Sequence, residues 1–264
     1  MKKFRIISGW LAIMAYLLFV PGFMWESYRE VICEEVDVRI SGDPGGSFVN
    51  QDEIMEIVRN GNGKLLGYPL FSINTREIEE KVNLQPFVKN TNIFRAAGGR
   101  LIVGVEQRVP VLRIIDKNRE DYYIDREGIV LPVSYSYTSH ILVASGNIPR
   151  IPDIRTGLSV IEREDDSNNG NHNVLNDLFI LASYIGNDSF WRSQIVQLYV
   201  VDENEFELIP RVGAHIIKFG GISDYELKFR KLRALYEYGL PHKGWNNYEV
   251  INIKYSNQVI CTRR

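Results

Sequence analysis

The stretch FVKNTNIFRAAGGRLIVGVEQR, residues 87–108, decides how the first half of the chain folds. Apolar and polar residues alternate on both sides of Gly98 and Gly99. This spacing is typical of two strands joined by a tight turn, because neighbouring side chains of a strand point to opposite faces. The two strands need further elements to cover their apolar face, and the sequence before them supplies these.

One strand and two helices are predicted upstream of this hairpin. VDVRI at 36–40 alternates as a strand does. Asn50 with Glu53, and Asn74 with Glu77, form capping boxes that begin helices. The apolar helix positions are Ile54, Ile57, Val58, Ile78 and Val82. The order strand, helix, helix, strand, strand predicts a three-stranded sheet with two helices on one face.

The chain after Arg108 is mostly strands. We expect strands, including one hairpin around Gly128, within 109–115, 122–130, 140–146, 195–201, 205–210 and 214–220. One helix is expected to end at Gly186, and a second to begin with a Ser223–Glu226 capping box and end at Gly239 before Pro241. Residues 162–173 are almost devoid of apolar side chains and predict a solvated loop. The fold class is therefore α+β, with a mostly antiparallel β domain that carries two helices.

The chain ends with YEVINIKYSNQVICTRR, residues 248–264. This pattern predicts a strand, a turn at 256–258 and a short last strand. An edge strand presents unpaired N–H and C=O groups, which proteins usually cover. Almost no sequence follows to cover this edge. We expect either that a partner chain covers it, or that Arg263 and Arg264 simply protect an ordinary edge.

The N-terminus predicts a membrane anchor. MKKFR at 1–5 is basic, and residues 6–25 contain no charge. About 20 apolar residues suffice to cross a hydrocarbon core of about 30 Å, and basic residues before the span keep the tail in the cytoplasm. The alternative is a cleaved signal peptide, whose apolar region is shorter and is followed by a cleavage site of small residues. No such site is evident, which favours the anchor.

Composition and motifs do not point to catalysis. The 264 residues are 45% hydrophobic and 24% charged with a net charge of −2, so no basic field indicates nucleic acid. The four histidines are far apart, and Asp165-Asp166 lies in the polar loop. We find no nucleophile, base and orienting group in a known motif, and we expect no cofactor, metal or small-molecule substrate. Cys33 and Cys261 are interpreted as two separate thiols, with a disulfide between them as the alternative.

The order of these features resembles the FtsQ/DivIB family of bacterial cell-division proteins. The junction of the family's two domains is similar at Pro86, Val88, Glu106 and Pro110, and YYIDREGIVLP at 122–132 resembles its Asp-x-x-Gly hairpin. The resemblance implies a cytoplasmic tail at 1–5, a transmembrane helix at 6–25, a POTRA domain at 34–106 and an FtsQ-type β domain at 107–264. It also implies a single-pass protein of the bacterial inner membrane, located at the division septum.

The resemblance further implies a scaffold that is not an enzyme. Members recruit the small membrane proteins FtsB and FtsL, and a strand of FtsB joins the sheet edge at the C-terminal end of the β domain. Addition of a strand takes affinity from main-chain hydrogen bonds and specificity from alternate side chains. The partner-binding residues so implied are Ile251, Ile253, Tyr255, Asn257, Gln258, Val259, Ile260 and Cys261.

Three positions depart from the family pattern. Ile141 and Leu142 replace a usual Leu-Pro pair, and Asn257 with Gln258 replaces a usual Ser-Gly turn. An arginine that usually precedes the 205–210 strand is not evident. Two other functions stay open: an envelope chaperone or secretion accessory protein with a POTRA domain, and an anchored envelope hydrolase.

Overall fold

The computed structural model describes residues 9–10, 13–17, 31–42, 46, 48–61, 65–134, 141–151, 158–161 and 173–264. Most of the apolar segment at 6–25, and residues 162–172 of the polar loop, lie outside these ranges. Within the described ranges, no helix has the length and apolar character that crossing a membrane requires. The chain forms two compact units, Met1–Gln107 and Arg108–Arg264.

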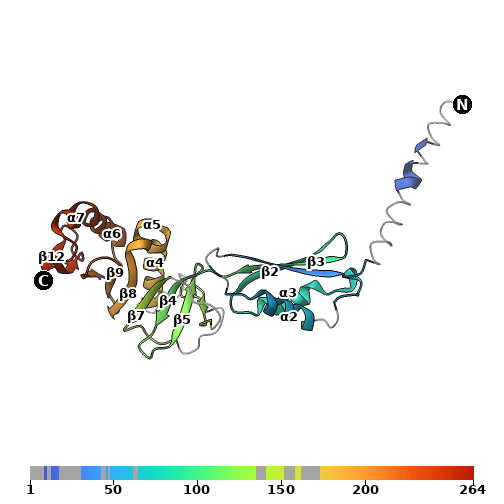
Figure 1. Ribbon diagram of the computed structural model, residues 1–264, viewed down its shortest axis with the longest axis horizontal. Coiled ribbons are helices and arrows are strands. Elements are labelled where there is room, and N and C mark those ends of the chain that lie inside the picture. The colour runs from blue at the N-terminus through green and yellow to red at the C-terminus, as the bar shows by residue number, and fades with distance from the viewer. Residues whose placement is uncertain are drawn as a thin grey trace. The chain divides into compact units, whose positions relative to one another are not determined.

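The first unit is a three-stranded sheet with two helices packed on it (Figure 1). Its elements are β1 (Glu35–Ser41), α2 (Gln51–Gly61), a 3-10 turn η1 (Leu70–Ser72), α3 (Thr75–Asn83), β2 (Val88–Ala96) and β3 (Arg100–Gln107). The strand order is β1-β3-β2, with β1 parallel and β2 antiparallel to β3. The predicted order of elements is confirmed.

Side-chain caps begin both helices of this unit. Asn50 accepts a hydrogen bond from the Asp52 N–H at 2.9 Å, and Asn74 accepts one from the Glu77 N–H at 3.4 Å. Each bond satisfies a donor that the first turn of a helix leaves unpaired. Four of the five predicted apolar positions are fully buried and Ile57 is half-buried; the four are Ile54, Val58, Ile78 and Val82.

The second unit is built on a nine-stranded mixed sheet. Its strands are β4 (Pro110–Ile115), β5 (Asp121–Asp125), β6 (Val130–Leu131), β7 (Leu142–Gly146), β8 (Ile195–Asp202), β9 (Glu205–Pro210), β10 (Ile216–Gly220), β11 (Tyr248–Asn252) and β12 (Ile260–Arg263). The order is β12-β11-β10-β9-β8-β7-β4-β5-β6. Three neighbouring pairs are parallel, β4 with β7, β7 with β8 and β10 with β11, and the others are antiparallel.

One row of paired residues crosses eight of these strands. Reading from the C-terminal edge, it consists of Cys261, Ile251, Ile217, Leu208, Leu198, Ala144, Ile114 and Tyr122. Paired residues project from the same face of a sheet. All members except the half-buried Cys261 are at most 1% exposed. The last strands therefore belong to the same core as the first ones.

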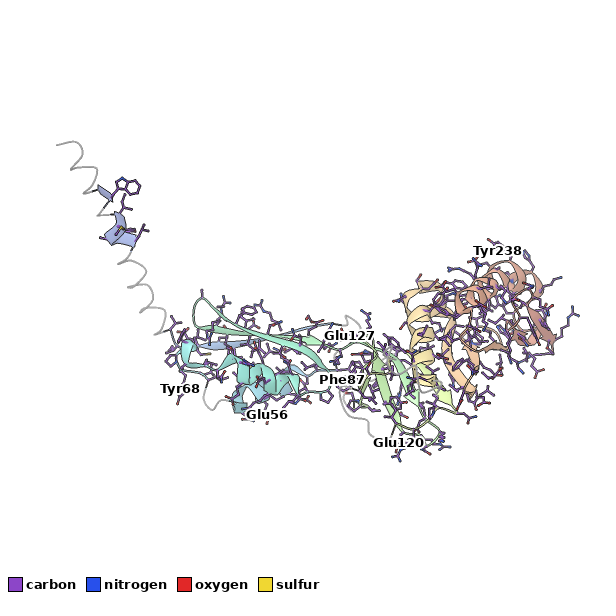
Figure 2. All side chains as sticks on the ribbon, turned by 180° about the vertical axis from the view of Figure 1, so that it is seen from behind. Glu56, Tyr68, Phe87, Glu120, Glu127 and Tyr238 are labelled. Carbon is purple, nitrogen blue, oxygen red and sulfur yellow. The ribbon has the colours of Figure 1, made fainter. Side chains whose placement is uncertain are left out.

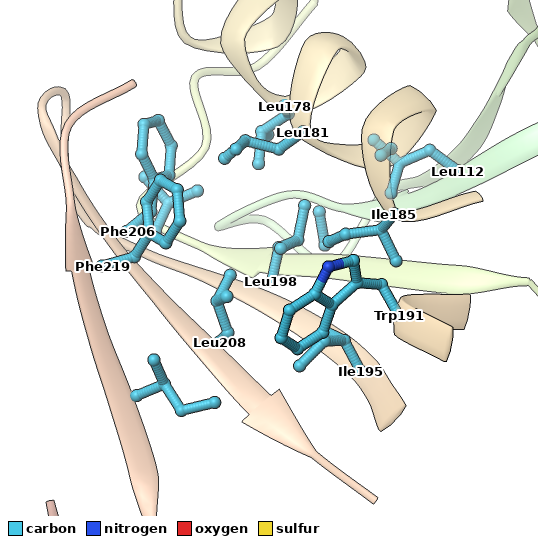
Figure 3. Packing of buried hydrophobic residues seen from close by; sticks show 14 of the residues in the cluster. Leu112, Leu178, Leu181, Ile185, Trp191, Ile195, Leu198, Phe206, Leu208 and Phe219 are labelled. Atoms are coloured by element: carbon cyan, nitrogen blue, oxygen red, sulfur yellow. The ribbon is translucent and has the colours of Figure 1, made fainter. Parts of the chain in front are cut away.

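Helices cover this face of the sheet. They are α4 (Val174–Asn187), α5 (Ser189–Gln194), α6 (Tyr225–Ala234), a π-helical turn η3 (Leu235–Gly239) and α7 (Leu240–Lys243). Figure 3 shows Trp191 of α5 lying among Ile195 and Leu198 of β8. The expectation of two helices was too simple, because α5 follows α4 after one capping residue and three helical segments follow one another from Tyr225 to Lys243.

The predicted limits of the last helix were wrong at both ends. Asp224, and not Ser223, precedes the first turn, and its φ of 53° places it in the left-handed region with no side-chain cap bond. At the other end the helix continues past Gly239 through a π-helical turn into α7. Pro241 lies in the first turn of α7, directly after Leu240, whose N–H still donates to the Leu235 carbonyl of the π-helical turn.

Replacing Leu198 with alanine is expected to lower the free energy of unfolding of the second unit by about 2–5 kcal/mol, since it leaves a cavity in the middle of the buried row. Val201 on the same strand is 37% exposed, so Val201→Ala is the control. This substitution is expected to change the free energy of unfolding by less than about 0.5 kcal/mol. Denaturant unfolding of the purified chain, followed by tryptophan fluorescence, measures both. Equal effects of the two substitutions would contradict the assigned core.

Candidate functional site at the C-terminal sheet edge

β12 is the last strand of the nine-stranded sheet and lies beside the C-terminus (Figure 1). It pairs with β11 through Tyr248–Arg263, Val250–Thr262, Ile251–Cys261 and Asn252–Ile260. In the part of the chain that the structure describes, no strand pairs with the other side of β12. Half of its main-chain N–H and C=O groups therefore point away from the sheet.

The opposite end of the same sheet is covered by its own chain. The Val130 N–H of β6 donates to the Leu158 carbonyl at 2.8 Å, and the Val160 N–H donates to the Gly128 carbonyl at 2.8 Å. Ile129 and Ser159 form an antiparallel bridge between these bonds. Residues 158–160 thus occupy the position that an added strand would need at β6.

The edges of the three-stranded sheet are less suited to accept a strand. On β2, the Ile93 N–H donates to a Glu79 carboxylate oxygen of α3 at 2.7 Å. β1 is open and runs along a groove of about 490 Å³, but it carries Glu35 and an exposed ion pair of Asp37 with Arg39. Charged side chains on an edge oppose pairing with another strand. β12 carries one charged residue, Arg263 at its end, whereas β1 carries three, so β12 is the edge with the fewest obstacles.

The two isoleucines expected at the partner edge lie inside the core. Ile251 and Ile253 are both 0% exposed, and β11 is paired on both sides, with β10 and with β12. The Ile253 N–H also donates to the Lys218 carbonyl at 3.0 Å. Their side chains and main chain are therefore occupied, and they can only support the edge from within.

The remaining expected residues are brought together in the turn and on β12. Tyr255 is 50% exposed, Ile260 is 42% exposed, and Asn257 and Gln258 of the turn are exposed. Two further residues are half-buried and pack against the core; these are Val259 and Cys261. The strand thus alternates between an inward side, which anchors it, and an outward side, which carries the exposed side chains.

Sequence reasoning missed the residue that holds the turn in place. Lys231 of α6 reaches across and donates from Nζ to the Ile253 carbonyl at 3.1 Å and also to the Tyr255 carbonyl. Partial burial lowers the pKa of Lys231 from its usual value. Lys231 lies 24 positions before Tyr255, so the sequence gives no sign of this contact. The packing of α6 against the segment that joins β11 to β12 creates it.

The outer face beside the edge carries apolar side chains that the sequence pattern did not single out. Ile216 of β10, Val250 of β11 and Thr262 of β12 are paired in one row, and Ile216 is 39% exposed. Ile260 projects from this same face one pair further along. Prediction of this patch would have required knowing that β10 and β11 pair in parallel, which is a non-local property.

A buried aromatic cluster lies beside the residues that precede β10 and β11. His215, which precedes β10, is 2% exposed, and its Nε2 lies 3.1 Å from the hydroxyl of Tyr236 in the π-helical turn. Tyr236 in turn packs edge-on against Trp245, just before β11. Burial lowers the pKa of His215 from its usual value, an effect that a hydrogen bond with the Trp245 backbone partly opposes.

Both cysteines are free, Cys33 in the first unit and Cys261 on β12. Burial raises the pKa of both thiols, so each is less reactive than an exposed cysteine. Among the residues that the structure describes, no group of three or more His, Cys, Asp or Glu side chains is placed to hold a metal ion.

Comparison with known proteins gives two family matches and one relative. A family described as FtsQ/DivIB, C-terminal related, matches residues 109–262, and a POTRA-like domain matches residues 31–106. The chain is 24% identical over 201 residues to the cell division protein FtsQ of Rhodothermus marinus. That alignment covers 74% of this chain and 67% of the relative.

Replacing Lys231 with methionine is expected to loosen the turn that follows β11, since it removes both side-chain bonds to the carbonyls there while keeping the apolar stem. Hydrogen exchange of residues 253–263 is expected to accelerate by roughly fivefold to tenfold, as the loss of about 1–1.5 kcal/mol implies. Lys243→Met, at an exposed position, is the control. Unchanged exchange in the Lys231 variant would show that this contact does not order the edge.

The second unit is expected to lose stability as the pH falls below about 6.5, the usual pKa of histidine. His215 has a lower pKa when folded, so the unfolded chain binds more protons between the two pKa values and is favoured there. The melting temperature is measured at about pH 7.5 and about pH 5.5. The difference between the two is expected to be smaller in His215→Gln than in the control His242→Gln, which replaces an exposed histidine. The same pH dependence in both variants would exclude His215 as its origin.

Proposed function

The chain belongs to the FtsQ/DivIB family of cell-division proteins, and we propose that it acts as a membrane-anchored scaffold that captures a partner strand at β12. Its role in cell division follows from the family. The partner and the mechanism of capture are the proposal, and the open outer side of β12 is the observation that carries it.

Geometry supports strand addition at this edge more than at any other described edge. β12 and β1 are each paired on one side only, but β1 carries three charged residues and β12 only Arg263, whereas β6 and β2 are blocked by Leu158 and Glu79. A partner strand would complete the main-chain hydrogen bonds of β12, and such bonds supply affinity without regard to sequence. The interaction therefore needs side chains to select the partner.

Tyr255 and Ile260 are the side chains best placed for that selection. Both are large, apolar and close to half-exposed, and they flank the turn and the start of β12. Aromatic residues are enriched among those that dominate the energy of interfaces. Asn257 and Gln258 would contribute polar contacts at the rim, while Val259 and Cys261 would hold the strand to the core.

The partner that fits this role is a strand of FtsB, with FtsL bound in the same complex. This assignment rests on the resemblance of the terminal hairpin to that of the family. Ile251 and Ile253 are kept in the site as its inner support, since both are buried under the ribbon. The scaffold would in this way connect FtsB and FtsL to the synthesis of septal peptidoglycan without carrying out a reaction itself.

The N-terminal segment completes the proposed arrangement. Residues 6–25 would span the inner membrane once, with the basic tail in the cytoplasm and the chain after Glu26 on the other side of the membrane. Such an anchor confines the protein to the membrane in which small bitopic partners also reside, which raises the effective concentration of one for the other.

Replacing Tyr255 with lysine is expected to weaken capture of FtsB by at least about thirtyfold, because it removes a central aromatic side chain and adds a charge at the edge. Tyr199→Lys is the matched control, since Tyr199 is 40% exposed on β8, away from the edge. Binding of purified FtsB to each variant measures the effect, and thermal unfolding confirms that each variant is folded.

Removal of residues 256–264 is expected to abolish capture while the first unit stays folded. The deletion removes β12 and the turn, so no edge with the same side chains is left. Retention of FtsB by the truncated chain would overturn the edge assignment. If Tyr199→Lys weakens FtsB binding as much as Tyr255→Lys does, the outer face of the sheet, and not the edge, binds the partner.

A further inference from the structure

The first unit exposes a group of large apolar side chains at one end. Ile32 is 45% exposed, Leu66 51%, Tyr68 54% and Phe71 58%. We refer to these four residues as the entry patch, because they surround the point at which the chain enters this unit. Figure 2 shows Tyr68 at one end of the unit and Phe87 at the other.

Main-chain hydrogen bonds hold the entry patch together. The Cys33 N–H donates to the Tyr68 carbonyl, the Gly67 N–H donates to the Cys33 carbonyl, and the Leu70 N–H donates to the Val31 carbonyl, each at 2.8 Å. These bonds fix the loop that carries Leu66, Tyr68 and Phe71 beside the chain that carries Ile32. The exposed side chains are therefore presented on ordered backbone.

Arg95 of β2 fixes the same end from a second side. Its Nε donates to the Leu70 carbonyl at 2.7 Å, and a terminal nitrogen of its guanidinium donates to the Ile73 carbonyl at 2.8 Å. The guanidinium also lies 5.9 Å from the ring centre of Phe71. Phe71 is thus held by its backbone and through its ring, although most of its side chain is exposed.

The length of chain before the patch limits what can cover it. Ile32 follows Trp25, the last residue of the uncharged segment, by seven positions. At no more than about 3.6 Å per residue, these positions span roughly 25 Å at most. If residues 6–25 span a bilayer, the entry patch cannot lie farther than this from the place where the chain leaves the hydrocarbon core.

We propose that the entry patch docks on the surface of the membrane in which the chain is anchored, with Tyr68 and Phe71 inserted at the headgroup level. This inference rests on the proposed function, since it requires the anchor. Aromatic and aliphatic side chains on an ordered loop suit the interface between water and hydrocarbon. Docking would orient the first unit relative to the membrane.

Charge is not the main source of attraction. Glu34 and Glu35 lie at this end together with Arg59, Arg95 and Arg100, so neither sign is in large excess. Docking is therefore expected to be driven by burial of apolar surface and to persist at high salt, which screens interactions between exposed charges. The occupant is the lipid surface itself and not an acidic protein.

The test measures contact of residue 71 with lipid in the complete chain. In a Cys261→Ser background, which leaves the buried Cys33 as the other thiol, Phe71→Cys is labelled with an environment-sensitive fluorophore and reconstituted in phosphatidylcholine–phosphatidylglycerol vesicles. Leu84→Cys is the matched control, because Leu84 is 78% exposed and follows α3 at the other end of the sheet. Nitroxide carried on the lipids quenches a fluorophore that touches the bilayer.

Quenching of the residue 71 label is expected to exceed that of the residue 84 label severalfold, because docking holds only residue 71 at the bilayer surface. High salt is expected to leave the difference unchanged. Equal quenching at the two positions overturns the proposal. So does a residue 71 label that is shielded from aqueous iodide but not quenched by lipid, since a second protein surface would then cover the patch.

A separate measurement distinguishes failure of the anchor from failure of docking. Vesicles are washed with alkaline carbonate, which removes chains that are not inserted. Retention of the chain with equal quenching at residues 71 and 84 overturns docking and leaves the anchor standing. Loss of the chain in the wash overturns the anchor, and the docking proposal with it.

Discussion

The structure depends on the requirement that every strand of the second unit pairs with a neighbour, a requirement that β12 meets on one side only. Ile251 illustrates the contrast, because it is paired with Ile217 on one strand and with Cys261 on the next. One strand further out, Cys261 has a partner on β11 alone. The outward N–H and C=O groups of β12 have no strand partner in the described part of the chain, and the free energy gained by pairing them is the reason to propose a binding role for this edge.

The open edge is anchored because Val259 and Cys261 pack against the core. The row that begins at Tyr122 of β5 ends at Cys261 of β12, and the buried pair His215 and Tyr236 packs beside Trp245, just before β11. Lys231 holds the turn by its carbonyls. An edge that is already ordered loses less conformational entropy when a strand binds, so less of the free energy of the main-chain bonds is offset. The helices of the second unit would in this sense be part of the proposed binding site.

Much of the fold could be predicted because local patterns specified it. Asn50 and Asn74 begin their helices as expected, and the strands on both sides of Gly98 and Gly99 form as expected. The last helix departs from its local pattern. Ser223 and Glu226 have the spacing of a capping box, but the Tyr225 N–H bonds to the Ile222 carbonyl, and Asp224 adopts a positive φ. Turn geometry imposed from outside the helix overrode the local signal.

The sequence by itself determined the order of elements in the first unit, the family and the presence of a terminal hairpin, because hydrophobic period, caps and turns act over a few residues. The tertiary structure alone decided which groups of that hairpin are free. Ile251, Ile253 and Tyr255 share one apolar alternation, yet the first two are buried and the third is half-exposed. Parallel pairing of β11 with β10, and the approach of Lys231, join residues far apart in the chain, and no local pattern encodes such contacts.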